Sequence, residues 1–235
     1  MEQDGAHFQL KLLQRWQLFC GPAEIHVPSR QQRLVSALAL IGPRPRRYLS
    51  GLLWPDSPEV RALESLRVSV HLMSRQSPGL IVADGPILSL TNSLSVDLHQ
   101  FLDHLRACEL SESCSAPDGC LSQLQRAELL PGWYEDWVVL EQNRLRNIRL
   151  RALVLHAGRW LEQGEAAKAA EAAQNALELE PLHETSIGFL MHAELELGNR
   201  PGALHAFESF KALLAAELGV QPSRHLSRLA QRIRV

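Results

Sequence analysis

The sequence lacks several features by which membrane proteins, secreted proteins and enzymes are recognised. No apolar run approaches the roughly 20 residues that a membrane-spanning helix needs. The first residues are polar and acidic, whereas a secretory signal begins with basic residues and continues with an apolar stretch. There is no glycine-rich phosphate loop, no Gly-x-Ser-x-Gly motif and no cluster of metal ligands. We therefore expect a cytoplasmic protein that contacts no membrane, holds no metal or cofactor, and is not an enzyme.

Cysteine is scarce, and its spacing fits no standard site. Of the four cysteines, Cys108, Cys114 and Cys120 are spaced six residues apart in a segment rich in Ser, Pro and Gly, and Cys20 stands alone. Zinc sites usually draw on cysteines two to four residues apart. We interpret the three as reduced thiols in a loop from residue 108 to 120, with a metal site or redox switch as the alternative.

Charge is distributed unevenly along the chain, although its net value is only −2. Residues 1–76 contain ten Lys and Arg against six Asp and Glu, a net of +4, and the remainder carries −6. Hydrophobic residues make up 46% of the chain, so long disordered stretches are not expected. A basic N-terminal region before an acidic remainder favours a polyanion-binding domain joined to a region with a different function.

The first 95 residues show strand patterns on either side of three helical patterns. Apolar residues alternate from Phe8 to Leu12 and Gly21 follows, which predicts a short antiparallel meander or hairpin over residues 8–27. Further on, Asp84 and Gly85 separate two β-prone runs, which is a strong hairpin signal.

Apolar residues at spacings of three and four predict helices over 30–41, 46–53 and 59–76, with Ser29 as the N-cap of the first. We assign the inward face of the third helix to five residues: Ala62, Leu63, Leu66, Val70 and Met73. Strands, three helices and a hairpin, in that order, are typical of a winged helix-turn-helix, in which two helices brace a third for the major groove. This domain is predicted to span residues 1–95.

The rest of the chain, residues 96–235, is predicted to be all-helical. Candidate helices cover 96–105, 121–130 and 133–155. Beyond them, Gly164 and Gly198 are 34 residues apart, as are Ala169 and Ala203, which is the period of a tetratricopeptide repeat. A last amphipathic helix, started by residues 221–223, is expected to cap the stack. We interpret the tryptophans of this region as core anchors rather than as an aromatic ligand cage; they are Trp133, Trp137 and Trp160. The predicted fold is thus mainly α: a winged helix with small antiparallel strands, then a tetratricopeptide-like superhelix.

An ordered series of short motifs resembles one family over about residues 8–233. The series comprises Leu52-Leu53-Trp54 before a Pro/Asp turn, Leu66-Arg67 with Met73-Ser74-Arg75, Val96-Asp97-Leu98 with Phe101, LLPGWYEDW followed by Arg144-Leu145-Arg146, and ELGVQPS. The chain resembles the small bacterial antibiotic regulatory proteins, in which an OmpR-type winged helix precedes a bacterial transcriptional activator domain. The resemblance implies that the third helix binds double-stranded promoter DNA, that the second domain makes dimer or regulatory contacts, and that the protein recruits RNA polymerase.

The candidate DNA-binding residues lie mostly on the outward face of the predicted third helix. Arginine can bind guanine through two hydrogen bonds, and Ser and His can reach bases or phosphates. We expect Arg67 and Ser69 to contact bases and Arg75 to hold a phosphate. The alternative is an ordinary solvated helix face. The full set on this helix is Arg61, Ser65, Arg67, Ser69, His71, Ser74 and Arg75, with Glu64 among them.

Two further groups are candidates for phosphate contacts. Ser29 and Arg30 open the first helix, where a helix N-terminus beside an arginine favours a phosphate, although an ordinary cap is an equal alternative. Arg44, Arg46 and Arg47 flank a Pro-rich turn and could clamp a phosphate, contact the polymerase or simply solubilise the turn.

The predicted wing is unfavourable for DNA binding. Its tip, residues 83–86, has an aspartate and no Lys or Arg, so insertion of an arginine into the minor groove is not expected. We expect modest affinity for one copy and binding as a homodimer on repeated half-sites. The competing hypothesis is a protein-interaction module whose winged helix has lost DNA binding.

Overall fold

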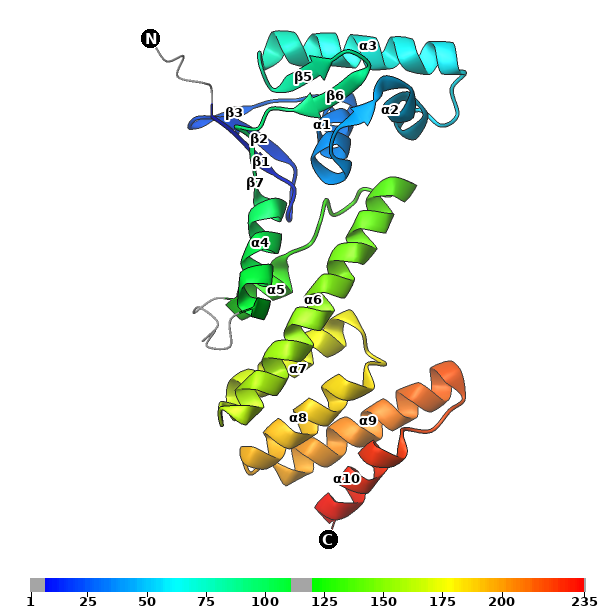
Figure 1. Ribbon diagram of the computed structural model, residues 1–235. Helices are drawn as coiled ribbons and strands as arrows, with labels where there is room; N and C mark the ends of the chain where they lie inside the picture. The colour runs from blue at the N-terminus through cyan, green and yellow to red at the C-terminus, as the bar shows by residue number, and fades with distance from the viewer. Residues whose placement is uncertain (1–6, 111–119, 235) are drawn as a thin grey trace. The chain divides into compact units, whose positions relative to one another are not determined.

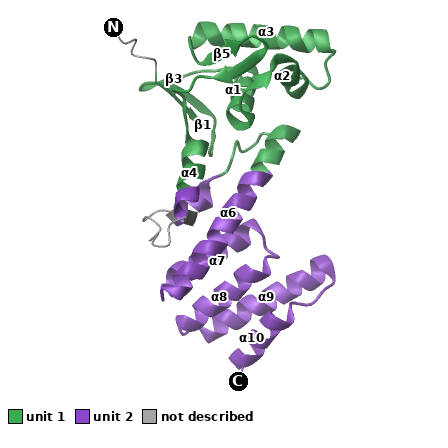
Figure 2. Cartoon of the chain, in the orientation of Figure 1, with its two compact units in different colours: residues 1–104, 128–142 green, residues 105–127, 143–235 purple. Residues whose placement is uncertain are grey.

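The computed structural model describes residues 7–110 and 120–234, and these fold into two compact units (Figure 2). The first comprises residues 1–104 with 128–142, and the second comprises residues 105–127 with 143–235. Two helices, α4 (Asp97–Leu110) and α6 (Asp136–Glu162), each contribute to both units. The predicted division between residues 95 and 96 therefore does not coincide with the division by packing, and it stays a prediction.

A four-stranded sheet opens the first unit. Its strands β1 (Phe8–Lys11), β2 (Gln17–Cys20), β3 (Ala23–Ile25) and β7 (Ser95–Val96) lie in the order β3-β2-β1-β7. The pairs β1–β2 and β2–β3 are antiparallel, so of the two predicted arrangements the meander is present, and β7 joins β1 in parallel. Phe8 and Leu10 are buried while Gln9 and Lys11 are exposed, so the alternation in the sequence marks the two faces of β1.

Three helices follow with nearly the predicted bounds: α1 (Ser29–Ile41), α2 (Arg46–Leu53) and α3 (Glu59–Gln76). Leu34, Val35 and Leu38 of α1 are almost completely buried, which gives these helices a common core with Leu49 and Leu53 of α2. Gly42 ends α1 at a positive φ of 73°, a conformation that costs glycine little. The helical predictions for residues 46–53 and 59–76 are confirmed.

The predicted hairpin is present and gains a third strand. Strands β5 (Ile81–Asp84) and β6 (Ile87–Leu90) pair through the turn at Gly85, and β4 (Arg44–Pro45) pairs with the other edge of β6 (Figure 1). The segment before α2, which we predicted as a turn, is thus a short strand. Strands, three helices and this hairpin complete the winged-helix arrangement.

The second unit is helical, as predicted. After α4 come α5 (Cys120–Arg126), α6, α7 (Ala166–Leu179), α8 (Glu184–Glu196), α9 (Arg200–Leu218) and α10 (Arg224–Arg234). Ala169 and Ala203 are completely buried, because only a small side chain fits where α7 and α9 cross their neighbours. Gly164 and Gly198 both have a positive φ in the turns that precede these helices. The 34-residue period therefore marks a real structural repeat.

The chain between α5 and α6 differs from its prediction. The expected helix over 121–130 ends at Arg126, because the following residues pair instead with the chain beyond β1. The N–H of Gln14 donates to the carbonyl of Glu128 at 2.7 Å, and the N–H of Leu130 donates to the carbonyl of Leu12 at 2.9 Å. The third candidate helix also begins later and ends later than predicted, as α6.

The start of α4 is held to the end of β1 by Asp97. Its carboxylate accepts hydrogen bonds from the N–H groups of Leu12 at 2.9 Å, Leu13 at 3.1 Å and Leu98 at 2.7 Å. Burial raises the pKa of Asp97, although these bonds and Lys11 act in the opposite direction. The motif Val96-Asp97-Leu98 therefore has a structural role where the chain leaves the wing.

Candidate nucleic-acid interface

Helix α3 is held against the rest of the first unit by one buried stripe. Ala62, Leu66, Ser69 and Met73 are each at most 2% exposed, and α3 packs on both α1 and α2. Their spacings of four, three and four residues place them on one side of the helix. The opposite side faces solvent, as a helix that enters a DNA groove requires.

Three arginines of α3 are available on that outward side. Arg61, Arg67 and Arg75 are exposed, and within the described part of the chain none of them forms an ion pair or a hydrogen bond. Glu64, His71 and Ser74 are exposed on the same helix, and Ser65 is half-buried. These side chains can offer hydrogen bonds to bases and positive charge to phosphates.

The prediction that Ser69 contacts bases is wrong. Its side chain is 2% exposed, because it lies one turn from Leu66 and from Met73 on the buried stripe. A small serine lets α3 approach the neighbouring helices closely. The sequence carried a signal for this, since positions 62, 66, 69 and 73 follow a regular helical spacing. The predicted inward face includes Leu63 and Val70 in place of Ser69, and both are only half-buried.

The N-terminus of α1 also differs from its prediction. Ser29 is the first residue of the helix rather than its cap; Pro28 occupies the cap position, and no side chain caps the helix. The carbonyl of Pro28 accepts hydrogen bonds from the N–H groups of Gln31 and Gln32. Ser29 and Arg30 are both exposed, so a phosphate contact at this end stays a prediction.

Two of the three arginines around β4 already have partners inside the first unit. Arg44 donates to the carbonyl of Pro43 at 2.9 Å, and its guanidinium lies 5.7 Å from the centre of the Tyr48 ring. Arg47 donates to Glu59 through Nε at 2.6 Å, which joins the first turn of α2 to that of α3. This hydrogen bond, and then the charge of Arg47, lowers the pKa of Glu59 below its usual value. Arg46 is half-buried, and its backbone N–H donates to the carbonyl of Pro86.

The wing presents an acidic and partly apolar tip. Residues 83–86 are exposed and include Asp84, and Val82 and Ile87 are 44% and 40% exposed. No basic side chain lies between residues 81 and 90. The wing therefore offers no positive charge for phosphates or for the minor groove.

The cysteine loop is only partly as predicted. Cys108 lies inside α4 and is buried, so it is not a loop thiol. Cys120 begins α5, and Cys114 lies outside the described residues. Across residues 7–110 and 120–234, no group of three or more His, Cys, Asp and Glu side chains is placed to hold a metal ion. In the same residues no helix is both long enough and apolar enough to cross a bilayer.

The tryptophans of the helical region are mainly core residues. Trp137 and Trp160 are 7% and 5% exposed, which confirms their interpretation as anchors, whereas Trp133 is half-buried. The ring of Trp160 stacks on that of His156, with 5.1 Å between the ring centres.

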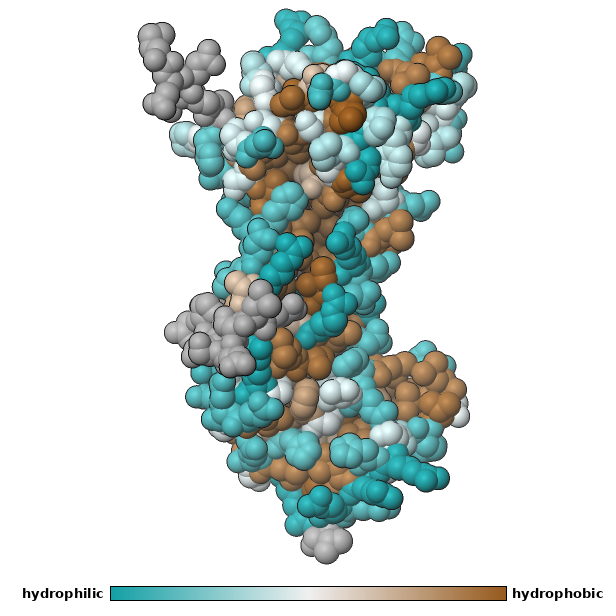
Figure 3. Space-filling view, in the orientation of Figure 1, coloured by the Kyte–Doolittle hydropathy of each residue, from teal (hydrophilic) through white to brown (hydrophobic). Residues whose placement is uncertain are grey.

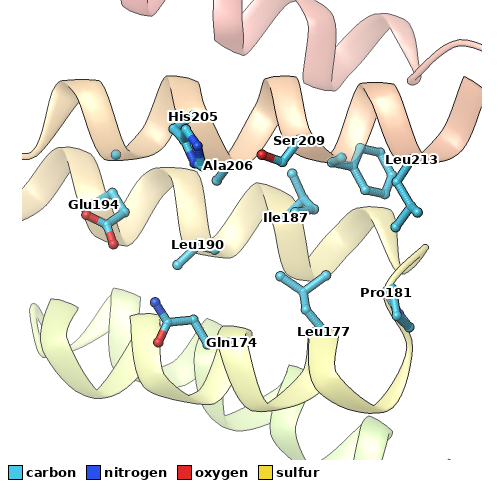
Figure 4. A pocket seen from close by; sticks show the side chains of 12 residues that line it. Gln174, Leu177, Pro181, Ile187, Leu190, Glu194, His205, Ala206, Ser209 and Leu213 are labelled. Atoms are coloured by element: carbon cyan, nitrogen blue, oxygen red, sulfur yellow. The ribbon is translucent and has the colours of Figure 1, made fainter.

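Sequence reasoning missed a groove in the second unit. It has a volume of about 500 Å³ and is formed by α7, α8 and α9, with Leu177, Ile187 and Leu190 on its apolar part and Glu194 and His205 among its polar groups (Figure 4). In the view of Figure 3, apolar residues gather over the C-terminal end of α9, where three large side chains are exposed: Leu213, Leu218 and Val220. Such surfaces suit protein contacts better than contacts with DNA.

Comparison with known proteins agrees with this architecture. The family model of the bacterial transcriptional activator domain matches residues 96–234, which is more than half of the chain. The regulatory protein AfsR of Streptomyces coelicolor is 30% identical over 218 residues, which cover 87% of this chain and 22% of that protein. The chain thus spans about a fifth of the length of this relative.

A solved structure, that of Mycobacterium tuberculosis EmbR in complex with a low-affinity phosphopeptide, matches 97% of this chain and 65% of that one. Its TM-score is 0.72 at 18% sequence identity, a likeness that concerns the fold. The winged helix with a helical superhelix is therefore a known combination. The family-model match over residues 96–234 shows that the chain belongs to the bacterial transcriptional activator domain family, and with the similarity to AfsR it supports a regulator of the antibiotic-regulatory-protein type.

Proposed function

We propose that the chain is a sequence-specific DNA-binding transcription activator that inserts α3 into the major groove. The observation that carries the proposal is the exposed outward side of α3, with three arginines that have no partner in the described part of the chain. Helices α1 and α2 hold the opposite side of α3, so the basic side stays in one orientation relative to the first unit. The family's regulatory role supports the same conclusion.

The charges predict moderate affinity and a measurable salt dependence. Each phosphate contact adds about 0.9 to the slope of log affinity against log salt concentration. Arg61 and Arg75 lie 14 residues apart, or about 21 Å along the helix axis at 1.5 Å per residue, so they suit phosphates on the two sides of a base-reading centre at Arg67. With an acidic wing, a single copy has few other cations to add.

The experiment is a binding titration with the full chain and a duplex selected from a random-sequence library. Arg67→Glu should abolish binding at salt concentrations where the wild type binds, because it removes a base contact and places a carboxylate in the groove. Arg228→Glu is the matched control, since Arg228 is exposed on α10 of the second unit. Circular dichroism should show the same melting temperature for all three proteins. Equal binding by the Arg67 variant would contradict the proposal.

The second unit supplies the protein contacts in this proposal. We assign to it a homodimer contact and a contact with RNA polymerase, with the chain acting in the cytoplasm. The groove on α7–α9 and the apolar end of α9 are the surfaces that support this part. Sedimentation with a duplex carrying two half-sites about 34–36 Å apart should give two chains per duplex. In vitro transcription from such a template should increase when the chain is added.

The wing and Arg47 support a second candidate: an interaction module whose winged helix no longer binds DNA. Asp84 stands at the wing tip, and Arg47 is paired with Glu59 rather than open to a phosphate. Failure of the selection to enrich any duplex at low salt, together with a stable partner protein, would favour this candidate. An enriched duplex would exclude it. Neither candidate is an enzyme.

A further inference from the structure

The outward side of α3 is not only polar. Val60, Val68 and Leu72 are 78%, 52% and 44% exposed on a helix whose inward stripe is already complete. An alkyl side chain that covers a phosphate oxygen removes it from water without offering a hydrogen bond, which is unfavourable. On a surface proposed to meet a duplex, these side chains therefore need an apolar counterpart.

Val68 and Leu72 form a pair within the basic side of α3. They are four residues apart, so their side chains are neighbours on the helix surface. Arg61 and Arg75 lie seven residues before and after Val68, which is about 10 Å along the helix axis in each direction. The pair is therefore an apolar centre between two guanidinium groups.

We propose that Val68 and Leu72 determine operator specificity by packing against the C5-methyl groups of thymines; the proposal rests on the proposed DNA-binding function. The thymine methyl is the only apolar group that base edges present in the major groove, and alkyl side chains recognise it by contact. Arg61 and Arg75 would hold the phosphates on either side, which fixes the register of the pair over the base edges.

A second copy of the chain is a poorer occupant of this surface. Two such faces would bring Arg61, Arg67 and Arg75 of each copy together, and like charges at close distance oppose association. Two alkyl side chains also provide far less than the roughly 1,000 Å² that a specific protein interface buries. A thymine-bearing duplex satisfies both the cations and the apolar pair.

The test begins with the full chain and duplexes selected from a random-sequence library. In the selected duplex each thymine is replaced in turn by deoxyuridine, which removes the C5-methyl and keeps the base pair. Loss of one buried methyl corresponds to about 0.8 kcal/mol, or about a four-fold loss of affinity at 1.4 kcal/mol per tenfold. We expect this loss at one or two positions in each half-site.

Alanine variants then test whether Val68 or Leu72 is the side chain that contacts the thymine methyl group. In Val68→Ala or Leu72→Ala, the loss caused by deoxyuridine at the matching position should disappear, as in a double-mutant cycle. Leu197→Ala is the matched control, because Leu197 is 51% exposed and lies in the second unit. This control should keep the full sensitivity to deoxyuridine.

The outcomes separate this inference from the proposed function. Selection of no duplex would overturn the proposed function, and this inference with it. Selection of a duplex that tolerates every deoxyuridine within two-fold, or whose sensitivity persists in both alanine variants, would overturn only the assignment of Val68 and Leu72. A selected site without an invariant thymine would also overturn the assignment of Val68 and Leu72 and leave the proposed function intact.

Discussion

Replacing Glu59 by glutamine should strengthen DNA binding. Glu59 is exposed in the first turn of α3, and it accepts the hydrogen bond from Nε of Arg47 at 2.6 Å. The substitution removes a negative charge from the helix that faces DNA and releases a guanidinium group at the start of α2. Since Arg47 lowers the pKa of Glu59, the carboxylate is fully ionised at neutral pH, where the substitution has its whole effect.

The magnitude follows from counterion release. One new phosphate contact by the released Arg47 makes the slope of log affinity against log salt concentration steeper by about 0.9. At about 0.1 M salt, one decade below 1 M, this steeper slope corresponds to about an eight-fold gain in affinity. The competing effect, loss of an anchor for α3, should be small because both partners of the ion pair are exposed. Ala62, Leu66 and Met73 hold the helix by buried packing instead.

Fluorescence anisotropy titrations of a labelled duplex, repeated over a series of salt concentrations, measure both quantities. Glu208→Gln is the matched control, because Glu208 forms a similarly exposed ion pair with Arg234 in the second unit. The control should leave affinity and slope unchanged. An unchanged slope in Glu59→Gln, or weaker binding, would refute the idea that Arg47 is a cation held back from DNA by its partner.

Two further predictions concern the packing that supports the sites. Asp97→Asn should lower the free energy of unfolding by about 1–3 kcal/mol, because an amide cannot accept all three backbone hydrogen bonds with its single oxygen. Burial raises the pKa of Asp97 above its ordinary value of 3.8, so ionisation of this carboxyl opposes folding. In urea titrations, the wild type should therefore exceed Asp97→Asn in free energy of unfolding by more near pH 4 than at pH 7. A smaller difference near pH 4 would contradict burial as the cause. Ala203→Leu should lower the free energy of unfolding by about 1–3 kcal/mol, because the larger side chain overpacks the crossing of α9 with its neighbours. Ala212→Leu, on the exposed side of the same helix, should leave the free energy of unfolding nearly unchanged. Equal melting temperatures for the two variants would contradict tight packing at this crossing.

Elements defined by local signals were predictable from the sequence. Pro45 and Pro58 stand just before α2 and α3, and Asp84 with Gly85 forms the tight turn of the wing. Gly164 and Gly198 set the repeat because the turn before each helix requires a positive φ, which costs glycine little. Such signals act within a few residues, so the sequence carries them directly.

Features that depend on distant residues were not predictable. The segment after Arg126 leaves the helical conformation because its backbone pairs with residues 12–14, more than a hundred positions earlier. Pairing of Arg47 with Glu59 likewise depends on how α2 meets α3. Of the candidate site, the arginines of α3 were found from spacing, but the burial of Ser69 and the exposure of Val68 depend on which way the helix is turned against α1 and α2.

The central claim, that α3 occupies the major groove, is tested most directly by methylation protection. Dimethyl sulfate modifies N7 of guanine in the major groove and N3 of adenine in the minor groove. We expect the full chain to protect guanine N7 positions in the selected duplex. In Arg67→Ala, the guanine that Arg67 contacts should lose its protection, whereas guanines near Arg75 should stay protected. A complex that leaves every N7 reactive, or protects N3 alone, would contradict it.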